Sequence, residues 1–427
     1  MMKRILTNIR RVAALCLCLA LLAGAACAEE ITEIPCGAGG FLSYMCTLPD
    51  GRVLLAGGKR DSGNYTCVNM WLVCLNTDRT VSWEYTASPE EISNAYSLSP
   101  AAEQCGVYQA AALKDGTVAA VMIADTFCGP THFPVLFLTQ DGIPTGKRLL
   151  LADGCQTPYA AEPSFLMTIG IRGEGPEDET MLIDWDGNVT VRYDGLVVPG
   201  AYGFKIRGED RLVTYGQDAT ENGHAVIAKM DAEGNVLWKT VLERLWPDTE
   251  DAQLMDAVQT GDGGYAACLR EDKRIPESDE WEMRYALVKF DADGHVAWTN
   301  RTIWEKDGCA LSSIYAHHGK ILVYCPPDGS DDFGADGLSR CFRWFDEDGK
   351  DLGATGPALA GADYPNLKQY LDAGKDRMAM TMIRRVIPME DSMWICAECN
   401  VREKQTDGDP RVIGESQEFV LVRLPEP

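Results

Sequence analysis

The stretch ALVKFDADGHVAW, residues 286–298, decides the fold of this chain. Its first five residues have strand character, and a second alternating run ends at Trp298. Between the two runs, Asp291 to Gly294 supply the acidic residues and the glycine that a tight turn with a positive-φ position requires. The stretch therefore predicts a β-hairpin.

Copies of this hairpin recur along the chain. They start at residues 71, 135, 180, 225 and 341, and a seventh first strand, FVLVRL, occupies residues 419–424. A second hairpin signal precedes each copy, for example FLSYMCTL-PDG-RVLLAGG from residue 41 and LKQYLDA-GKD-RMAMTMI from residue 367. Seven units of four strands predict an all-β fold, a seven-bladed β-propeller of four-stranded antiparallel blades.

We expect one propeller domain over residues 29–427. Its blades are predicted near residues 38–86, 105–151, 155–194, 201–243, 253–303, 309–355 and 364–427. The last unit ends at its third strand, and residues 30–37 precede the first unit without a hairpin of their own. An N-terminal strand is therefore expected to close the ring as the missing fourth strand. An alternative register makes residues 394–401 the third strand of the last blade and residues 419–424 its fourth.

Residues 1–28 have the pattern of a secretory signal peptide. Basic residues precede an apolar run over residues 12–22, and Ala26-Cys27-Ala28 fits cleavage after Ala28. A lipoprotein anchored through Cys27 is the alternative. No later apolar run approaches the ~18 residues of a membrane span. We expect a secreted or envelope-associated protein.

The net charge limits the classes of partner. The formal charge is −25, and removal of four basic residues with the signal makes it −29. Such a surface repels nucleic acids and anionic lipids, whereas cationic partners, metal ions and neutral glycans stay open.

Sixteen cysteines minus the three before residue 28 leave thirteen, so at least one thiol is expected to be unpaired. Cys325 and Cys341 flank the turnaround between the second and third strands of the sixth unit and are a disulfide candidate. Cys396 and Cys399 have C-x-x-C spacing without a second pair nearby, so a disulfide or two ordinary strand residues explain them equally well.

No metal site is expected, although one loop could bind calcium. Asp328, Asp331, Asp332 and Asp336 lie together in the loop DGSDDFGADG, which is also typical of a solvated acidic loop. His317-His318 falls in a short turn of a chain with five histidines, which argues against a histidine-rich metal centre.

The long connections of the predicted propeller gather on one face. They are expected over residues 59–70, 126–134, 270–284, 326–340 and 385–418 within units, and over residues 88–104 and 242–252 between units. They carry aromatic or histidine residues outside the repeat positions: Tyr65, Phe127, His132, Phe133, Trp246, Trp281 and Trp394. As a set they indicate a ligand-binding face, while each could instead anchor its own loop. Trp83, Trp238 and Trp298 share one repeat position and are interpreted as packing between blades.

The repeats at residues 225–238 and 286–298 resemble the PQQ-like, quinoprotein-type propeller repeats of exported bacterial proteins. The resemblance implies the fold and little about function. The turns lack the usual threonine and are one residue shorter, the chain has no adjacent cysteine pair, and Cys396-x-x-Cys399 is followed by Asn400 rather than histidine. No cofactor is therefore expected.

Two hypotheses for function follow. The first is an exported, non-enzymatic propeller that binds a glycan, a peptide or an envelope protein through the long-loop face. The second is a glycan-active hydrolase or lyase with carboxylates such as Asp332, Glu280 or Asp391 over the channel. The sequence singles out no carboxylate pair and leaves the oligomeric state open.

Overall fold

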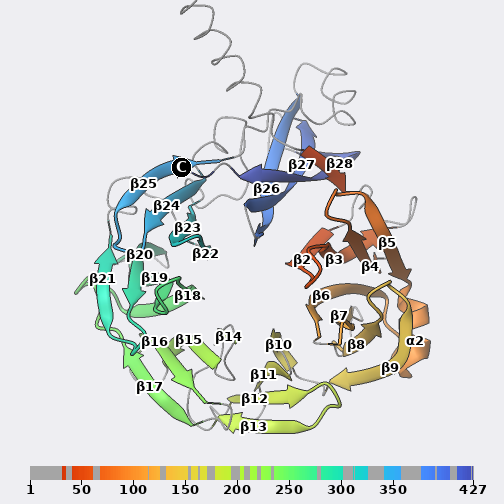
Figure 1. Cartoon of the computed structure of the whole chain (residues 1–427), viewed down its shortest axis with the longest axis horizontal. Helices are drawn as coiled ribbons and strands as arrows, with labels where there is room; N and C mark the ends of the chain where they lie inside the picture. Colours follow the sequence, from red (N-terminus) through yellow and green to blue (C-terminus); the bar gives the residue numbers. More distant parts are fainter. Residues whose placement is uncertain are drawn as a thin grey trace, which may run out of the picture.

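The computed structural model describes residues 31–34, 41–60, 68–113, 115–125, 131–151, 155–161, 164–170, 178–193, 202–205, 212–218, 223–231, 235–276, 280–301, 311, 313–325, 341–356, 377–389, 392–403, 411–424 and 426. The fold is all-β, as predicted. Its strands form seven four-stranded sheets, and every pair of neighbouring strands within a sheet is antiparallel. Figure 1 shows the sheets arranged as the blades of a β-propeller around a common centre.

In each blade the strands follow one another from the innermost to the outermost (Figure 1). Blade 1 has β2 (Phe41–Thr47), β3 (Val53–Arg60), β4 (Val68–Leu75) and β5 (Val81–Ala87). Blade 2 has β6 (Gln104–Ala112), β7 (Val118–Asp125), β8 (Phe133–Leu138) and β9 (Pro144–Leu151). Blade 3 has β10 (Cys155–Ala161), β11 (Ser164–Gly170), β12 (Asp178–Asp184) and β13 (Val189–Tyr193). Blade 4 has β14 (Tyr202–Lys205), β15 (Leu212–Asp218), β16 (His224–Met230) and β17 (Val236–Val241).

Three blades complete the ring. Blade 5 has β18 (Asp251–Gln259), β19 (Tyr265–Arg274), β20 (Trp281–Phe290) and β21 (Val296–Asn300). Blade 6 has β22 (Ser313–His317), β23 (Lys320–Tyr324), β24 (Phe342–Asp346) and β25 (Asp351–Thr355). Blade 7 has β26 (Arg377–Pro388), β27 (Met393–Glu403), β28 (Arg411–Leu424) and, from the other end of the chain, β1 (Ile31–Ile34).

The N-terminal strand closes the ring, as predicted. β1 pairs antiparallel with β28, with Ile31 opposite Val422 and Ile34 opposite Phe419. Residues 419–424 therefore belong to the third strand of blade 7, and the alternative that made them the fourth strand is wrong.

The inner half of blade 7 differs from the sequence prediction. Residues 377–383 were expected to be its second strand, but they begin β26, the first strand. The expected long loop over residues 385–418 instead contains β27 and the start of β28. Two apolar runs of the sequence competed for each of the two inner strands of blade 7. The pairing of β27 with both β26 and β28 shows that β26 is the first strand and β27 the second.

A second correction concerns the connection between blades 1 and 2, which was expected to be a loop. It contains the helix α2 (Pro89–Tyr96). The side chain of Ser88 accepts from the N–H of Glu91, and Glu91 accepts from the N–H of Ser88, so the two form a capping box. The spacing Ser-Pro-Glu-Glu is a sequence signal for such a helix start.

The repeated tryptophan and the repeated turn glycine form one contact between neighbouring blades. A Cβ atom placed on Gly294 of blade 5 would lie 2.5 Å from Cε3 of Trp238 in blade 4. The same contact joins Trp298 to Gly349 and Trp83 to Gly142. These contacts confirm the expected packing of the three tryptophans between blades. Neighbouring blades thereby bury faces that would otherwise be exposed.

The first aspartate of the tight turn is occupied by the turn itself. Oδ1 of Asp291 accepts the N–H groups of His295 at 2.8 Å and Asp293 at 2.9 Å. These hydrogen bonds hold the pKa of Asp291 below its usual range. Asp184, Asp231 and Asp346 accept from the residue four positions on in the same way. The acidic repeat is therefore turn chemistry.

Candidate functional site

A pocket of about 200 Å³ opens between the innermost strands of blades 1 and 2. Phe41 and Gln104, the first residues of β2 and β6, line it together with Asp125, the last residue of β7. First strands begin and second strands end on the face that carries the long connections. The pocket therefore lies on the face where the sequence predicted ligand binding.

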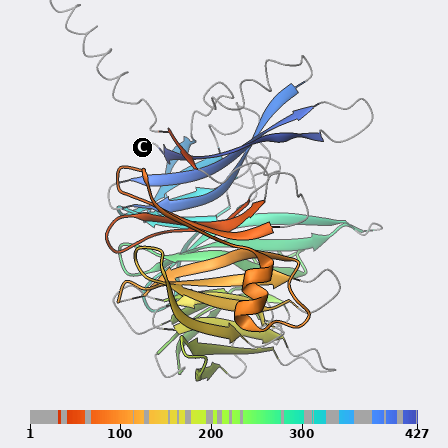
Figure 2. The same ribbon diagram turned by 90° about the vertical axis from the view of Figure 1, so that its right-hand side faces the viewer.

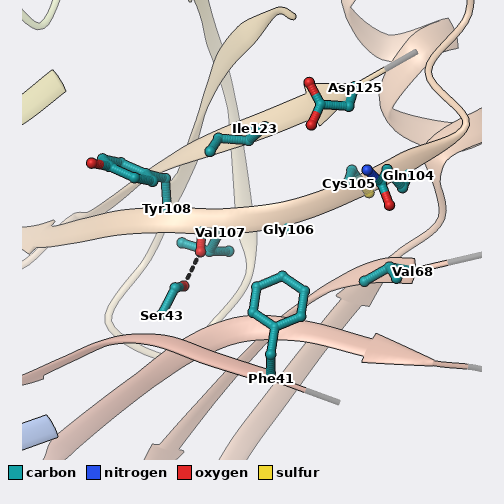
Figure 3. A pocket seen from close by; sticks show the side chains of 10 residues that line it. All are labelled: Phe41, Ser43, Val68, Gln104, Cys105, Gly106, Val107, Tyr108, Ile123 and Asp125. Carbon is teal, nitrogen blue, oxygen red and sulfur yellow. Dashed lines mark hydrogen bonds between the residues drawn. The ribbon is translucent and has the colours of Figure 1, made fainter. Parts of the chain in front are cut away.

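The pocket has aromatic walls (Figure 3). Phe41 projects from β2 toward blade 2, and Tyr108 lies on the β6 side. The ring of Phe41 fits here because two neighbours are glycines: an added Cβ would lie 2.3 Å from the ring at Gly58 and 2.6 Å from it at Gly106. Phe41 is nevertheless 39% exposed, so its ring is accessible to a ligand.

The polar groups of the pocket are few. Among the described residues that line it, Asp125 alone carries a formal charge, and Gln104, Ser43 and the hydroxyl of Tyr108 supply the other oxygen or nitrogen groups of side chains. The Ser43 hydroxyl donates to the carbonyl of Val107 and thereby links β2 to β6. A pocket lined by one acidic group and two aromatic side chains suits a ligand that is both cationic and partly apolar.

Sequence reasoning missed these pocket residues because they lie within repeating strands. The usable signals were positional: Phe41 and Gln104 start first strands, and Gly58 and Gly106 interrupt runs of larger residues. Only the neighbouring blades reveal that these positions meet.

Four of the loop residues proposed for ligand binding are buried. His132 is 6% exposed and pairs with Ala124 through two backbone hydrogen bonds of 2.9 Å, next to Asp125 of the pocket. Phe133 begins β8, lies opposite Leu151 of β9, and belongs with it to one buried hydrophobic cluster. Trp394 lies in β27 rather than in a loop, with its Nε1 donating to Ser392 Oγ at 3.0 Å.

Trp246 is the fourth buried residue of this set, and the buried carboxylate of Glu271 holds its backbone in place. Glu271 is completely buried and accepts from the N–H groups of Leu245 and Trp246 and from the Thr249 hydroxyl. These contacts fit a residue that holds its own loop.

Trp281 is 44% exposed, and Tyr65 and Phe127 lie outside the described residues. Trp281 starts β20, which extends with β19 well beyond the expected loop boundaries at residues 270 and 284. Figure 2 shows the β19–β20 and β27–β28 hairpins, both between second and third strands, projecting on the same side of the ring. Trp281 is therefore an exposed aromatic residue separated from the pocket along the ring.

The calcium-binding loop and the candidate disulfide both stay predictions. Asp328, Asp331, Asp332 and Asp336 lie outside the described residues, so calcium binding there stays a prediction. Cys325 and Cys341 are both buried, and the N–H of Cys325 donates to the carbonyl of Cys341 at 2.7 Å. The two residues are thus neighbours across strands, and their disulfide also stays a prediction.

Cys396 and Cys399 belong to different hydrophobic clusters. Cys396 packs with Trp394 and Phe419, whereas Cys399 packs with Ile395 and Ala397. Because successive strand residues point to opposite faces, a spacing of three separates the two side chains. This strand geometry favours two core residues over a joint metal or redox pair.

The carboxylates considered for catalysis are not brought together in the described part of the chain. Asp332 and Asp391 lie outside it, and Glu280 is an exposed residue beside Trp281. No helix among the described residues is long and apolar enough to cross a membrane.

No family model and no curated protein sequence matches the chain. Among solved structures, it is similar to the β-propeller domain of the Trilobed protease from Pyrococcus furiosus, with 11% identity and a TM-score of 0.47 over 88% of this chain and 98% of that chain. The chain is also similar to the alpha-L-arabinanase of Penicillium chrysogenum, with 9% identity and a TM-score of 0.42 over 93% of this chain and 98% of that chain.

Prolyl oligopeptidase B from Galerina marginata gives 10% identity and a TM-score of 0.47 over 90% of this chain and 51% of that one, so the chain spans about half of its length. At these identities the likeness concerns the fold alone. The chain is a β-propeller protein, a fold shared by hydrolases and binding proteins.

Proposed function

We propose that this protein is an exported propeller, related to the quinoprotein-type repeat proteins but without their cofactor, that binds a basic segment of a peptide or envelope protein. The observation that carries the proposal is the pocket between β2 and β6, in which Asp125 lies with Phe41 and Tyr108.

The size of the pocket supports a side chain as its occupant. Sites that enclose a whole small molecule usually measure ~300–1,000 Å³, so about 200 Å³ is suited to one arginine or lysine side chain of a larger partner. The stem of such a side chain can pack on Phe41 while its cation lies over a ring or pairs with Asp125. The net charge of −25 steers basic partners toward the protein.

The test is a binding screen of the full chain against peptides that differ only by arginine, lysine, glutamine or norleucine at one position, with neutral glycans as a second arm. We expect arginine and lysine peptides to bind, and Asp125→Asn to weaken them about tenfold, or ~1.4 kcal/mol. Phe41→Leu keeps the apolar volume but removes the ring and should also weaken binding.

Asp115→Asn is the matched control, because Asp115 is an exposed carboxylate at the tight turn between β6 and β7 of the same blade. Binding that is equal for glutamine and arginine peptides, or that survives both pocket substitutions, would contradict the proposal. Binding of neutral glycans alone, lost in Phe41→Leu, would move the assignment to a glycan module.

A further inference from the structure

The turn between β22 and β23 has an unusual residue at its first position. His317 pairs with Lys320, so His318 and Gly319 form a two-residue loop, with φ values of +50° and +70°. Two positive values are the mark of a type I′ hairpin turn, where Asn-Gly is the favoured sequence. Histidine is tolerated there. The turn stacks the two imidazoles, with ring centroids 3.8 Å apart.

A carboxylate from a distant part of the sequence reaches the same place. Glu426 follows β28 of blade 7, and its Oε1 lies 3.0 Å from Nε2 of His317. Its Oε2 lies 3.9 Å from Nδ1 of His318. One donor atom from each of the three residues can be chosen so that all lie within 4.8 Å of one another.

We propose that His317, His318 and Glu426 bind a divalent transition metal of the zinc class. Zinc takes imidazole nitrogen at ~2.0–2.1 Å and carboxylate oxygen at ~2.0–2.2 Å, which places the ligand atoms of a tetrahedron about 3.4 Å apart. His317 lies 3.0 Å from Oε1 of Glu426 and His318 lies 3.9 Å from Oε2, so each imidazole is near this spacing from a different oxygen of the carboxylate. A rotation that presents one carboxylate oxygen to both imidazoles would complete three ligands, with water in the fourth position.

The surroundings of the trio are suited to one ion. The side chain of His317 is 6% exposed and that of Glu426 is 23% exposed, whereas His318 is 52% exposed and gives access from solvent. Lys320 opposes the metal, because its Nζ lies 3.9 Å from Oε2 of Glu426. Its side chain is 27% exposed and long enough to turn toward water.

The metal would connect blade 6 to blade 7, the blade that closes the ring. His317 and His318 belong to blade 6, and Glu426 follows the strand of blade 7 that pairs with β1. An ion held by both blades fixes the end of β28 where the ring closes. Because it binds the folded chain, it raises the unfolding temperature by an amount that grows with the logarithm of its concentration relative to its Kd.

The experiment uses the untagged full chain, stripped with a chelator and titrated with Zn²⁺ in a calorimeter and in thermal unfolding. We expect one zinc per chain and a higher Tm. His318→Asn and Glu426→Gln should each weaken binding more than about tenfold. His318→Asn should keep or raise the Tm without metal, because asparagine is preferred at this turn position. Lys320→Met should tighten binding.

His295→Asn is the matched control, since His295 is an exposed histidine that faces Asp291 in the tight turn of another blade. It should leave zinc affinity unchanged. The proposal is overturned if the wild type binds no zinc at millimolar concentration, or if His318→Asn and Glu426→Gln bind it like the wild type. A Co²⁺ complex with the charge-transfer absorption of thiolate ligands would also overturn it, because the site contains no cysteine.

Discussion

The indole of Trp298 in blade 5 lies across Gly349 in the β24–β25 turn of blade 6, and its Nε1 donates to the carbonyl of Glu347 at 3.0 Å. Trp83 in blade 1 makes the same contact with blade 2. Its indole lies across Gly142, and its Nε1 donates to the carbonyl of Gln140 at 2.9 Å. In these blades the turn of one hairpin packs against the tryptophan of the preceding blade, which couples the two blades.

This contact predicts unequal effects of two glycine substitutions. Gly294 and Gly263 have φ values of +84° and +83°, but an added Cβ meets Trp238 at 2.5 Å in the first case and nothing within 4 Å in the second. Gly263→Ala should cost ~1–2 kcal/mol from backbone strain alone. Gly294→Ala should cost a further ~1–3 kcal/mol from the clash, measured by urea unfolding. Equal losses of unfolding free energy in the two variants would show that Trp238 moves aside without a measurable cost.

A second prediction concerns Lys289, which is 2% exposed. Its ammonium lies 2.8 and 2.9 Å from the carboxylate oxygens of Asp262. Asp262→Asn leaves a buried cation without its counter-charge and should cost ~2 kcal/mol, a value reduced because Asp262 is half exposed. Lys289→Met removes the charge itself and should cost less than ~1 kcal/mol. The reverse order would contradict the ion-pair interpretation.

The same pair predicts a pH dependence. Burial acts to raise the pKa of Asp262, but hydrogen bonds from Lys289, Thr260 and Gly264 outweigh it and hold that pKa below 3.8. The stabilisation is therefore complete above the unfolded-state pKa and is lost as the pH falls through the lower folded-state value. Unfolding midpoints measured from about pH 5 down to pH 2 should fall less steeply in Asp262→Asn than in the wild type.

Glu271 should be essential for the loop that carries Trp246. Its side chain accepts from Leu245 N at 2.6 Å, Trp246 N at 3.2 Å and Thr249 Oγ1 at 2.7 Å. Glu271→Ala leaves these buried donors without an acceptor and should cost ~2–4 kcal/mol. Glu243→Ala, at an exposed position, should change stability by less than ~0.5 kcal/mol. Amide exchange of residues 244–250 should accelerate only in the first variant.

Ring closure by β1 predicts the effect of removing residues 29–37. Four strand residues pair with β28, and their loss should lower the free energy of unfolding by about 2 kcal/mol or more. The bare edge of β28 should also promote association, visible by size-exclusion chromatography. A chain that begins at residue 29 is the control, and an unchanged melting curve after the longer deletion would refute the closure.

Cys325 and Cys341, which are neighbours across strands, stay a candidate disulfide, and we predict that they can pair under oxidising conditions. Non-reducing peptide mapping should recover the two peptides linked. If they remain thiols, burial raises the pKa of Cys341 to about 12, so alkylation near pH 8 should be slow until the chain unfolds. Recovery of two separately alkylated peptides after denaturation would contradict the disulfide.

Much of the fold could be predicted because the repeat is encoded locally. Asp291 accepts N–H groups from within its own turn, and the hairpin around it forms by pairing of near neighbours in the chain. Blade 7 was only partly predictable, since two apolar runs competed for each inner strand. The helix α2 carried a readable capping box at Ser88 and Glu91.

The sequence by itself determined the strands and turns of blades 1 to 6 and the last strand pair of blade 7, because side-chain alternation and turn glycines act over a few residues. Only the tertiary structure decided which residues meet across blades: Trp298 with Gly349, Phe41 with Gly106, and His317 with Glu426. The physical reason is that these pairs come from different hairpins. Their contact depends on how neighbouring sheets pack and where the ring closes, which no local pattern records.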